Sequence, residues 1–155
     1  MDIKDLLKNI RAERIELEVL REKADEIRSS LLPKAITYDG VRVQTSHDDK
    51  TIEVISHLTE IEELEGKRMV RLAAHISMAE KVIDQMPTAE YRNLISLRYI
   101  HGKSPMSWYD VAEKMGYSSK YVRGKLHGRA LAEARGIWEK EKEKEKEKEE
   151  APGDI

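Results

Sequence analysis

Residues 108–123, with the sequence WYDVAEKMGYSSKYVR, leave few choices for the local structure. Val111 and Met115 lie four residues apart and therefore face one side of a short helix. Gly116 can adopt the positive φ that ends a helix and turns the chain sharply. The serine pair at 118–119 supplies a side-chain oxygen that caps the next helix. The pattern predicts a helix-turn-helix.

The helix that follows the turn has an apolar side and a basic side. Val122 and Leu126 return the apolar stripe to the core, and we expect this second helix over about residues 119–134. The alternative is an ordinary helical hairpin with a solvated basic face. The small pair Ala112 and Gly116, the turn, the cap and the basic second helix together favour docking in the major groove of DNA.

The candidate DNA-contacting residues surround the start of this second helix. Recognition helices read bases with their first turns. The base-edge or groove candidates are therefore Lys120, Tyr121, Arg123 and Lys125. The two serines are placed to donate to phosphate. Arg129, Lys114 and Lys103 either contact the DNA backbone or only supply solubilising charge. We expect His127 and Tyr121 beside the exposed cations. The full set comprises Ser118, Ser119, Lys120, Tyr121, Arg123, Lys125 and Arg129.

The charge is distributed unevenly along the 155 residues, although the formal net charge is only −2. Residues 1–87 carry 14 Lys/Arg and 18 Asp/Glu, whereas residues 88–138 carry nine Lys/Arg and four Asp/Glu. Residues 139–155 carry five Lys and eight Asp/Glu. The positive charge therefore lies on the predicted helix-turn-helix, as binding to phosphates requires.

The N-terminal region predicts a long helix from Ile3 to Leu31 that Pro33 ends. Its heptad positions are apolar except at Glu13, which is typical of a coiled-coil seam. Charged residues make up 37% of the chain and aromatic residues 5%, which favours long solvated helices over a large core. The seam positions are Ile3, Leu6, Ile10, Glu13, Leu17, Leu20, Ala24, Ile27 and Leu31.

A second long helix is predicted from about Asp49 to Met86, after a connector over residues 33–48. We expect an aspartate, Asp48 or Asp49, to cap it, and Tyr38-Asp39-Gly40 to form a turn in the connector. The interval between the two apolar stripes contains Gly66 and predicts a phase shift or a soft bend. The stripes are Val54, Leu58 and Ile61, then Met69, Leu72, Ile76, Ala79, Ile83 and Met86.

The predicted fold class is thus all-α: a long N-terminal helical hairpin or coiled coil, followed by a C-terminal helix-turn-helix bundle. We expect an arm over residues 1–87 and a DNA-binding domain over residues 88–138, in which Thr88 caps the first helix. The tail over residues 139–155 alternates Glu and Lys, which places like charges at i and i+4. With no apolar residue to anchor it, we expect this tail to be frayed or disordered.

The sequence offers little for an enzyme, a metal site or a membrane protein. It has no cysteine, phosphate loop or nucleophile elbow, so we expect no catalytic residues and no cofactor. His47, Asp48 and Asp49 lack further ligands at a suitable spacing, so we expect no metal site. No apolar run approaches the roughly 20 residues that span a bilayer. These features predict a cytoplasmic protein.

The C-terminal half resembles region 4 of bacterial sigma factors, the helix-turn-helix that reads a promoter element and touches RNA polymerase. The resemblance is carried by Leu97–Lys103, Ser107-Trp108, Val111-Ala112, Met115–Ser118, Val122, Leu126-His127 and Ala130-Leu131. The chain is more similar still to small phage and prophage proteins of Gram-positive bacteria, including ArpU-type late transcriptional regulators. Their connectors contain a similar element, Tyr38–Ser46 here, so the resemblance covers about residues 36–135. It implies a transcriptional regulator in the bacterial cytoplasm, with double-stranded DNA and RNA polymerase as candidate partners.

Two features depart from that pattern. Pro105 and Met106 lengthen the loop before Trp108, which leaves the docking angle of the motif open. Gly124 and Gly128 weaken the recognition helix, each by about 1 kcal/mol relative to alanine. The glycines suit a close approach of the helix to DNA backbone or to another helix.

Two other functions stay open from the sequence. A DNA-recognition subunit of a phage packaging machine, similar to a small terminase, also combines a helix-turn-helix with oligomerising helices. A coiled-coil adaptor would bind only protein and would show no salt-dependent binding to DNA. The seam of the first helix can pair within the chain or between chains, and we favour a homodimer through the long helices.

Overall fold

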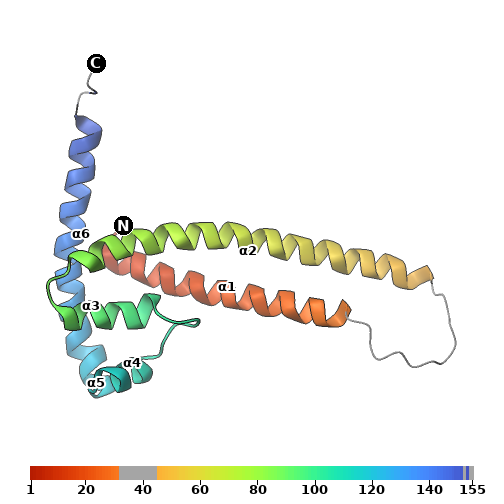
Figure 1. Ribbon diagram of the computed structural model, residues 1–155, viewed down its shortest axis with the longest axis horizontal. Helices are drawn as coiled ribbons and strands as arrows, with labels where there is room; N and C mark the ends of the chain where they lie inside the picture. Colours follow the sequence, from red (N-terminus) through yellow and green to blue (C-terminus); the bar gives the residue numbers. More distant parts are fainter. Residues whose placement is uncertain (32–44, 152, 154–155) are drawn as a thin grey trace. The chain divides into compact units, whose positions relative to one another are not determined.

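The computed structural model describes residues 1–31, 45–151 and 153. All regular secondary structure in these ranges is helical, which confirms the predicted class, and a long hairpin precedes shorter packed helices (Figure 1). Single π-helical turns, η1 and η2, continue the helices beside them. The elements are α1 (Ile3–Leu31), α2 (Thr45–Gln85), α3 (Ala89–Ile95), η1 (Ser96–Ile100), α4 (Trp108–Met115), α5 (Ser119–Tyr121), η2 (Val122–Leu126) and α6 (His127–Glu150).

The described chain forms two compact units. One contains Met1–Ile15 and Leu72–Ile155, and the other contains Glu16–Arg71. The start of α1 and the end of α2 therefore belong with the helix-turn-helix, although the sequence assigns all of residues 1–87 to a separate arm. In the described part of the chain, no helix combines the length and apolar character needed to span a membrane.

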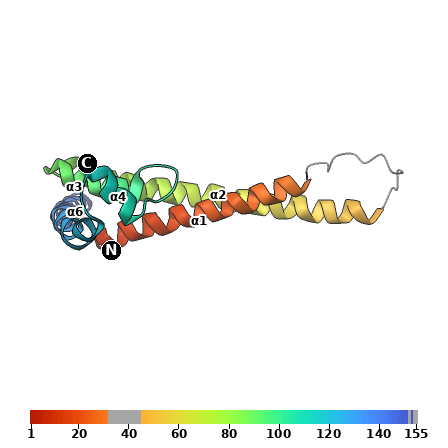
Figure 2. The ribbon, with the colours of Figure 1, turned by 90° about the horizontal axis from the view of Figure 1, so that it is seen from below.

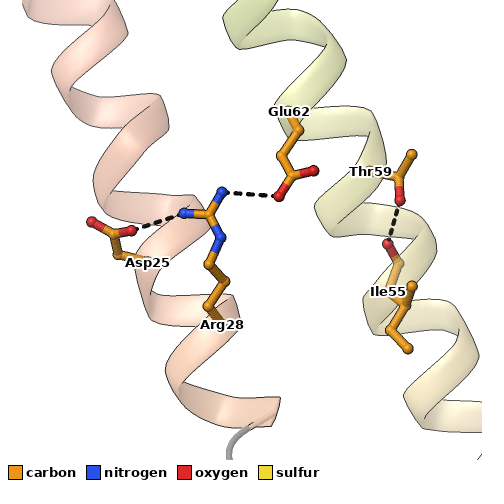
Figure 3. A network of polar contacts seen from close by, with 5 residues as sticks. All are labelled: Asp25, Arg28, Ile55, Thr59 and Glu62. Atoms are coloured by element: carbon orange, nitrogen blue, oxygen red, sulfur yellow. Dashed lines mark hydrogen bonds and ion pairs between the residues drawn. The ribbon is translucent and has the colours of Figure 1, made fainter.

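The unit formed by residues 16–71 is an antiparallel pair of helices with a narrow seam. Leu17, Ala24 and Ile61 are buried in it, as the heptad pattern predicts. Arg28 of α1 bridges the two helices at its surface: its guanidinium binds Asp25 on the same helix and Glu62 on α2, both at 2.9 Å (Figure 3). Exposed ion pairs of this kind add little stability, so the apolar seam holds the pair together.

Helix α2 begins four residues earlier than the sequence predicts. It starts at Thr45, so Asp49 lies inside the helix and does not cap it. The expected turn at residues 38–40 and most of the connector lie outside the described residues, as do the side chains of His47 and Asp48. The helix ends at Gln85, one residue before the predicted end and two before Pro87.

The apolar stripe of α2 runs through Gly66 without the predicted phase shift. Glu65 and Arg68 occupy the two stripe positions between Ile61 and Leu72, at the regular spacing of four, three and four residues, and both are half-buried. Arg68 is held there by Glu16 of α1 at 2.8 Å. Met69 is therefore not a core residue and is 46% exposed. Because Glu65 and Arg68 are polar, the apolar pattern is interrupted in the sequence, although the spacing of the buried side of the helix continues unchanged.

Glu13, the one polar residue of the α1 seam, meets a polar partner on α2. Its carboxylate lies 2.9 Å from Nδ1 of His75, and both side chains are largely buried. A polar pair at one seam position fixes which residues of two helices face each other, because a shift along the seam would leave either group unpaired.

The core of the helix-turn-helix unit is formed by residues of α1, α2, α3, η1, α4, η2 and α6, whereas α5 has no buried residue. Thr88 occupies the N-cap position of α3, but its hydroxyl makes no cap bond there. It instead donates to Glu133 of α6 at 2.8 Å, which joins the two ends of the motif. The largest buried side chains of the core are Ile3, Leu6, Leu7, Ile10, Val82, Met86, Leu94, Ile95, Val111, Val122 and Leu126.

The Glu/Lys tail is helical, where the sequence predicts disorder. Helix α6 continues to Glu150 because it is anchored just before the tail: Trp138 is buried, and its Nε1 donates to the carbonyl of Met1 at 3.0 Å. Glu141 accepts from Gln85 at 3.0 Å and pairs with Lys144 at 3.6 Å. The tail extends a helix that is already formed, so it bears no nucleation cost. The i,i+3 pairs and the high helix propensity of Glu and Lys then favour its extension.

Candidate nucleic-acid interface

The helix-turn-helix has the glycine turn and the serine cap that the sequence predicts, and a further serine caps its first helix. Ser107 Oγ accepts from the backbone N–H of Asp110 at 3.1 Å at the start of α4. Gly116 ends α4 with φ 77°, a conformation that side chains with a Cβ disfavour. Ser118 Oγ then accepts from the N–H of Tyr121 at 3.2 Å and starts α5. The predictions for Gly116 and for a cap at the serine pair are therefore confirmed.

The predicted recognition helix is a single run of α5, η2 and α6, with the π-helical turn near its start. Figure 2 shows α6 nearly end-on, beside the N-terminus of the chain. Val122 and Leu126 are fully buried at the two ends of η2. The three residues between them, Arg123, Gly124 and Lys125, are exposed. The π turn thus presents an unbroken exposed segment near the beginning of the helix.

The structure gathers the predicted DNA-contacting residues on one short stretch. The side chains of Lys120, Arg123, Lys125 and Arg129 are exposed, and no ion pair engages them in the described part of the chain. Ser118 is exposed, and Ser119 is half-buried. Tyr121 is half-buried because its ring packs against Tyr117, with centroids 5.2 Å apart. The stretch therefore carries four cations at the helix start, where a phosphate would meet them.

His127 belongs to the core side of the helix and not to the exposed basic face where we expected it. Its Nε2 lies 2.8 Å from the hydroxyl of Tyr99, and its ring meets Trp108 edge-on with centroids 4.6 Å apart. Burial, with the charges of Arg98, Lys4 and Lys8, lowers the pKa of His127 to about 4. The imidazole is therefore neutral at physiological pH and acts as a packing group between three elements.

Acidification should destabilise the protein through His127. Its pKa is lower in the folded state than the ordinary value of 6.5, so the unfolded chain binds the extra proton. Stability is fully present above pH 6.5 and falls as the pH drops toward about 4, by about 1–2 kcal/mol after allowance for solvent screening. Urea unfolding at pH 7 and at about pH 4.5 measures the loss. His127→Gln should show a smaller loss, and an equal loss in both proteins would contradict this role.

Arg98 fixes the loop that leads into α4. It lies over the Trp108 ring, 4.1 Å from the centroid, and its Nη1 donates to the carbonyl of Met106 at 2.7 Å. Burial lowers its pKa from the ordinary value, as do the charges of Arg11 and Arg123. Stacking on the ring compensates a half-buried guanidinium. Arg98 is thus an internal support, and no acidic partner is seen for it among the described residues.

Two arginines of α1 hold the same loop, and sequence reasoning missed both. Arg14 donates from Nη1 to the carbonyl of Tyr99 at 2.7 Å and from Nη2 to those of His101 and Gly102 at 3.2 and 2.6 Å. These carbonyls end η1 or follow it, where the backbone lacks partners within the helix. Arg14 lies four residues after the buried Ile10, which was the available sign that it points inward.

The extra residues before Trp108 therefore do not leave the motif loose. The carbonyl of Met106 accepts from Arg11 Nη1 at 3.0 Å as well as from Arg98. Two guanidinium groups on one carbonyl fix the chain one residue before the cap of α4. The long loop is a built part of the motif, and α1 helps to position the first helix.

Comparison of the chain with known protein families, with characterised proteins and with solved structures found no match. The function is therefore argued from the geometry above.

Proposed function

We propose that this protein is a sequence-specific DNA-binding transcriptional regulator of phage or prophage type. Its recognition helix, residues 119–134, would lie in the major groove of double-stranded DNA. The observation that carries the proposal is the exposed group Lys120, Arg123, Lys125 and Arg129 on a helix whose opposite side is fully packed. These cations take no part in the fold, and their placement after a capped turn matches the docking geometry of a recognition helix.

We further propose that the protein works as a homodimer in the bacterial cytoplasm and that RNA polymerase is a second partner. Support for the dimer comes from the hairpin unit, which exposes large apolar side chains. Ile52 is 62% exposed and Val70 is 73% exposed on α2. A second copy of the pair would cover such residues, as it does in a helical bundle.

Binding of the purified protein to DNA from its own genomic neighbourhood tests the proposal. The assay compares that duplex with a scrambled duplex of equal length at two salt concentrations. Tight binding to one upstream region with a steep salt slope is the expected result. Equal weak binding to every duplex would contradict sequence-specific recognition. No binding at low salt would overturn the proposal and favour a protein partner for the basic helix.

Gly124→Ala should change protein stability and DNA affinity in opposite directions. A Cβ at position 124 would meet no atom within 4 Å, so Gly124→Ala should stabilise the helix by about 0.5–1 kcal/mol. If the helix approaches DNA closely there, the same change should weaken DNA binding. Gly136→Ala is the matched control, because Gly136 is exposed on the same helix beyond the motif and equally unhindered. Thermal unfolding and DNA titration of both variants provide the comparison, and unchanged affinity in Gly124→Ala would exclude the close approach.

A further inference from the structure

Helix α1 carries a basic stripe beside the recognition helix. Lys4, Lys8 and Arg11 lie at spacings of four and three residues, so they occupy one side of the helix. The C-terminal end of the stripe is fixed, because Arg11 donates to the carbonyl of Met106 next to α4. The lysines therefore extend the basic surface along α1, away from this contact.

The N-terminal end of α1 is fixed to α6. Asp2 pairs with Arg135 at 3.1 Å, and the Met1 carbonyl accepts from Trp138 at 3.0 Å. Lys4 and Lys8 are thus held between two anchors, one on α6 and one on the loop before α4. Their charges are felt at His127, the first residue of α6, where they help to lower the imidazole pKa. Both lysines therefore lie near His127, in the middle of the predicted recognition helix.

Neither lysine has a visible role in the fold. Both are exposed, and no ion pair engages them in the described ranges. Lys4 lies in the first turn of α1, where a positive charge opposes the helix dipole. The position is unfavourable for the helix and favourable for an anion brought to the surface.

We infer that Lys4 and Lys8 bind backbone phosphates of the same DNA duplex whose major groove receives the recognition helix. The inference rests on the proposed function and extends it to a second element, so that α1 and α6 would grip the duplex together. Ammonium groups on flexible stems bind phosphate as point charges and read no sequence. These lysines would add affinity and fix the orientation of the motif without changing which sequence is preferred.

The test is the salt dependence of binding by Lys4→Gln/Lys8→Gln in the full-length protein, with a mixed-sequence DNA duplex as the probe. Each neutralised phosphate contributes about 0.9 to the slope of log affinity against log salt, so the slope should fall by up to about 1.8. Specific and scrambled duplexes should weaken by the same factor. Lys23→Gln/Lys67→Gln is the matched control, because both lysines are exposed and lie in the unit formed by residues 16–71.

The outcomes separate the inference from the function on which it rests. A wild-type slope in the Lys4/Lys8 variant, together with tight and salt-dependent binding of the wild-type protein to its preferred duplex, would overturn the inference and leave the proposed function standing. No DNA binding by the wild-type protein would overturn both. Thermal unfolding of the variant guards against a folding defect, and we expect its Tm to be unchanged or slightly raised because an unfavourable charge is removed.

Discussion

Arg14→Met should lower the free energy of unfolding by about 2–4 kcal/mol, the largest loss expected from a single change outside the apolar core. Arg14 is only 8% exposed, and its two terminal nitrogens reach three backbone carbonyls. Hydrogen bonds from a charged donor contribute about 1.5–3 kcal/mol each before the cost of burying the charge is subtracted. Methionine preserves the apolar stem but leaves those carbonyls without their donor.

The measurement is urea unfolding of wild type, Arg14→Met and Arg21→Met. Arg21 lies on the same helix with an exposed side chain, so its replacement should change stability by no more than about 0.5 kcal/mol. Arg14→Lys should recover only part of the loss, because a single ammonium cannot reproduce the planar fork. Equal stabilities for the two methionine variants would show that the contacts of Arg14 do not hold the loop.

The residues that hold this loop also show where sequence reasoning stops. The heptad of α1 predicts the buried face correctly because the seam repeats over many turns, and the signal accumulates. Arg11 and Arg14 donate to backbone carbonyls that lie 85 to 95 residues away in the sequence. Every residue has a carbonyl, so the sequence does not show which ones will accept. The sequence shows only that each arginine follows a heptad position of α1, Ile10 or Glu13. The heptad pattern does not indicate that either arginine binds another element.

Predictions from local signals are correct where a residue acts on its neighbours. Gly116 and Ser118 are examples, since the turn and the cap are completed within three or four residues. His127 was misplaced because its partners, Tyr99 and Trp108, come from other elements. Helix α6 likewise outlasts its predicted end because its anchor, the Met1 carbonyl, lies at the opposite end of the chain.

Arg123→Ala should weaken binding to the preferred duplex by roughly 5- to 150-fold, the range for loss of one bidentate contact with a base. Arg123 is the candidate best placed to read a base. It is exposed in the π turn at the start of the helix, directly after the buried Val122 that fixes the backbone there. Removing it should leave stability almost unchanged, because its side chain is not part of the core.

The ratio of specific to non-specific affinity decides how Arg123 acts. If it reads a base, the variant should lose more affinity for the preferred duplex than for a scrambled one, and discrimination at one base pair should relax. If it contacts only phosphate, both affinities should fall equally and the salt slope should shrink by about 0.9. Arg71→Ala is the matched control, an exposed arginine of α2 in the unit formed by residues 16–71. Equal binding by Arg123→Ala, Arg71→Ala and wild type would remove the recognition helix from the interface and, with it, the proposed mode of DNA binding.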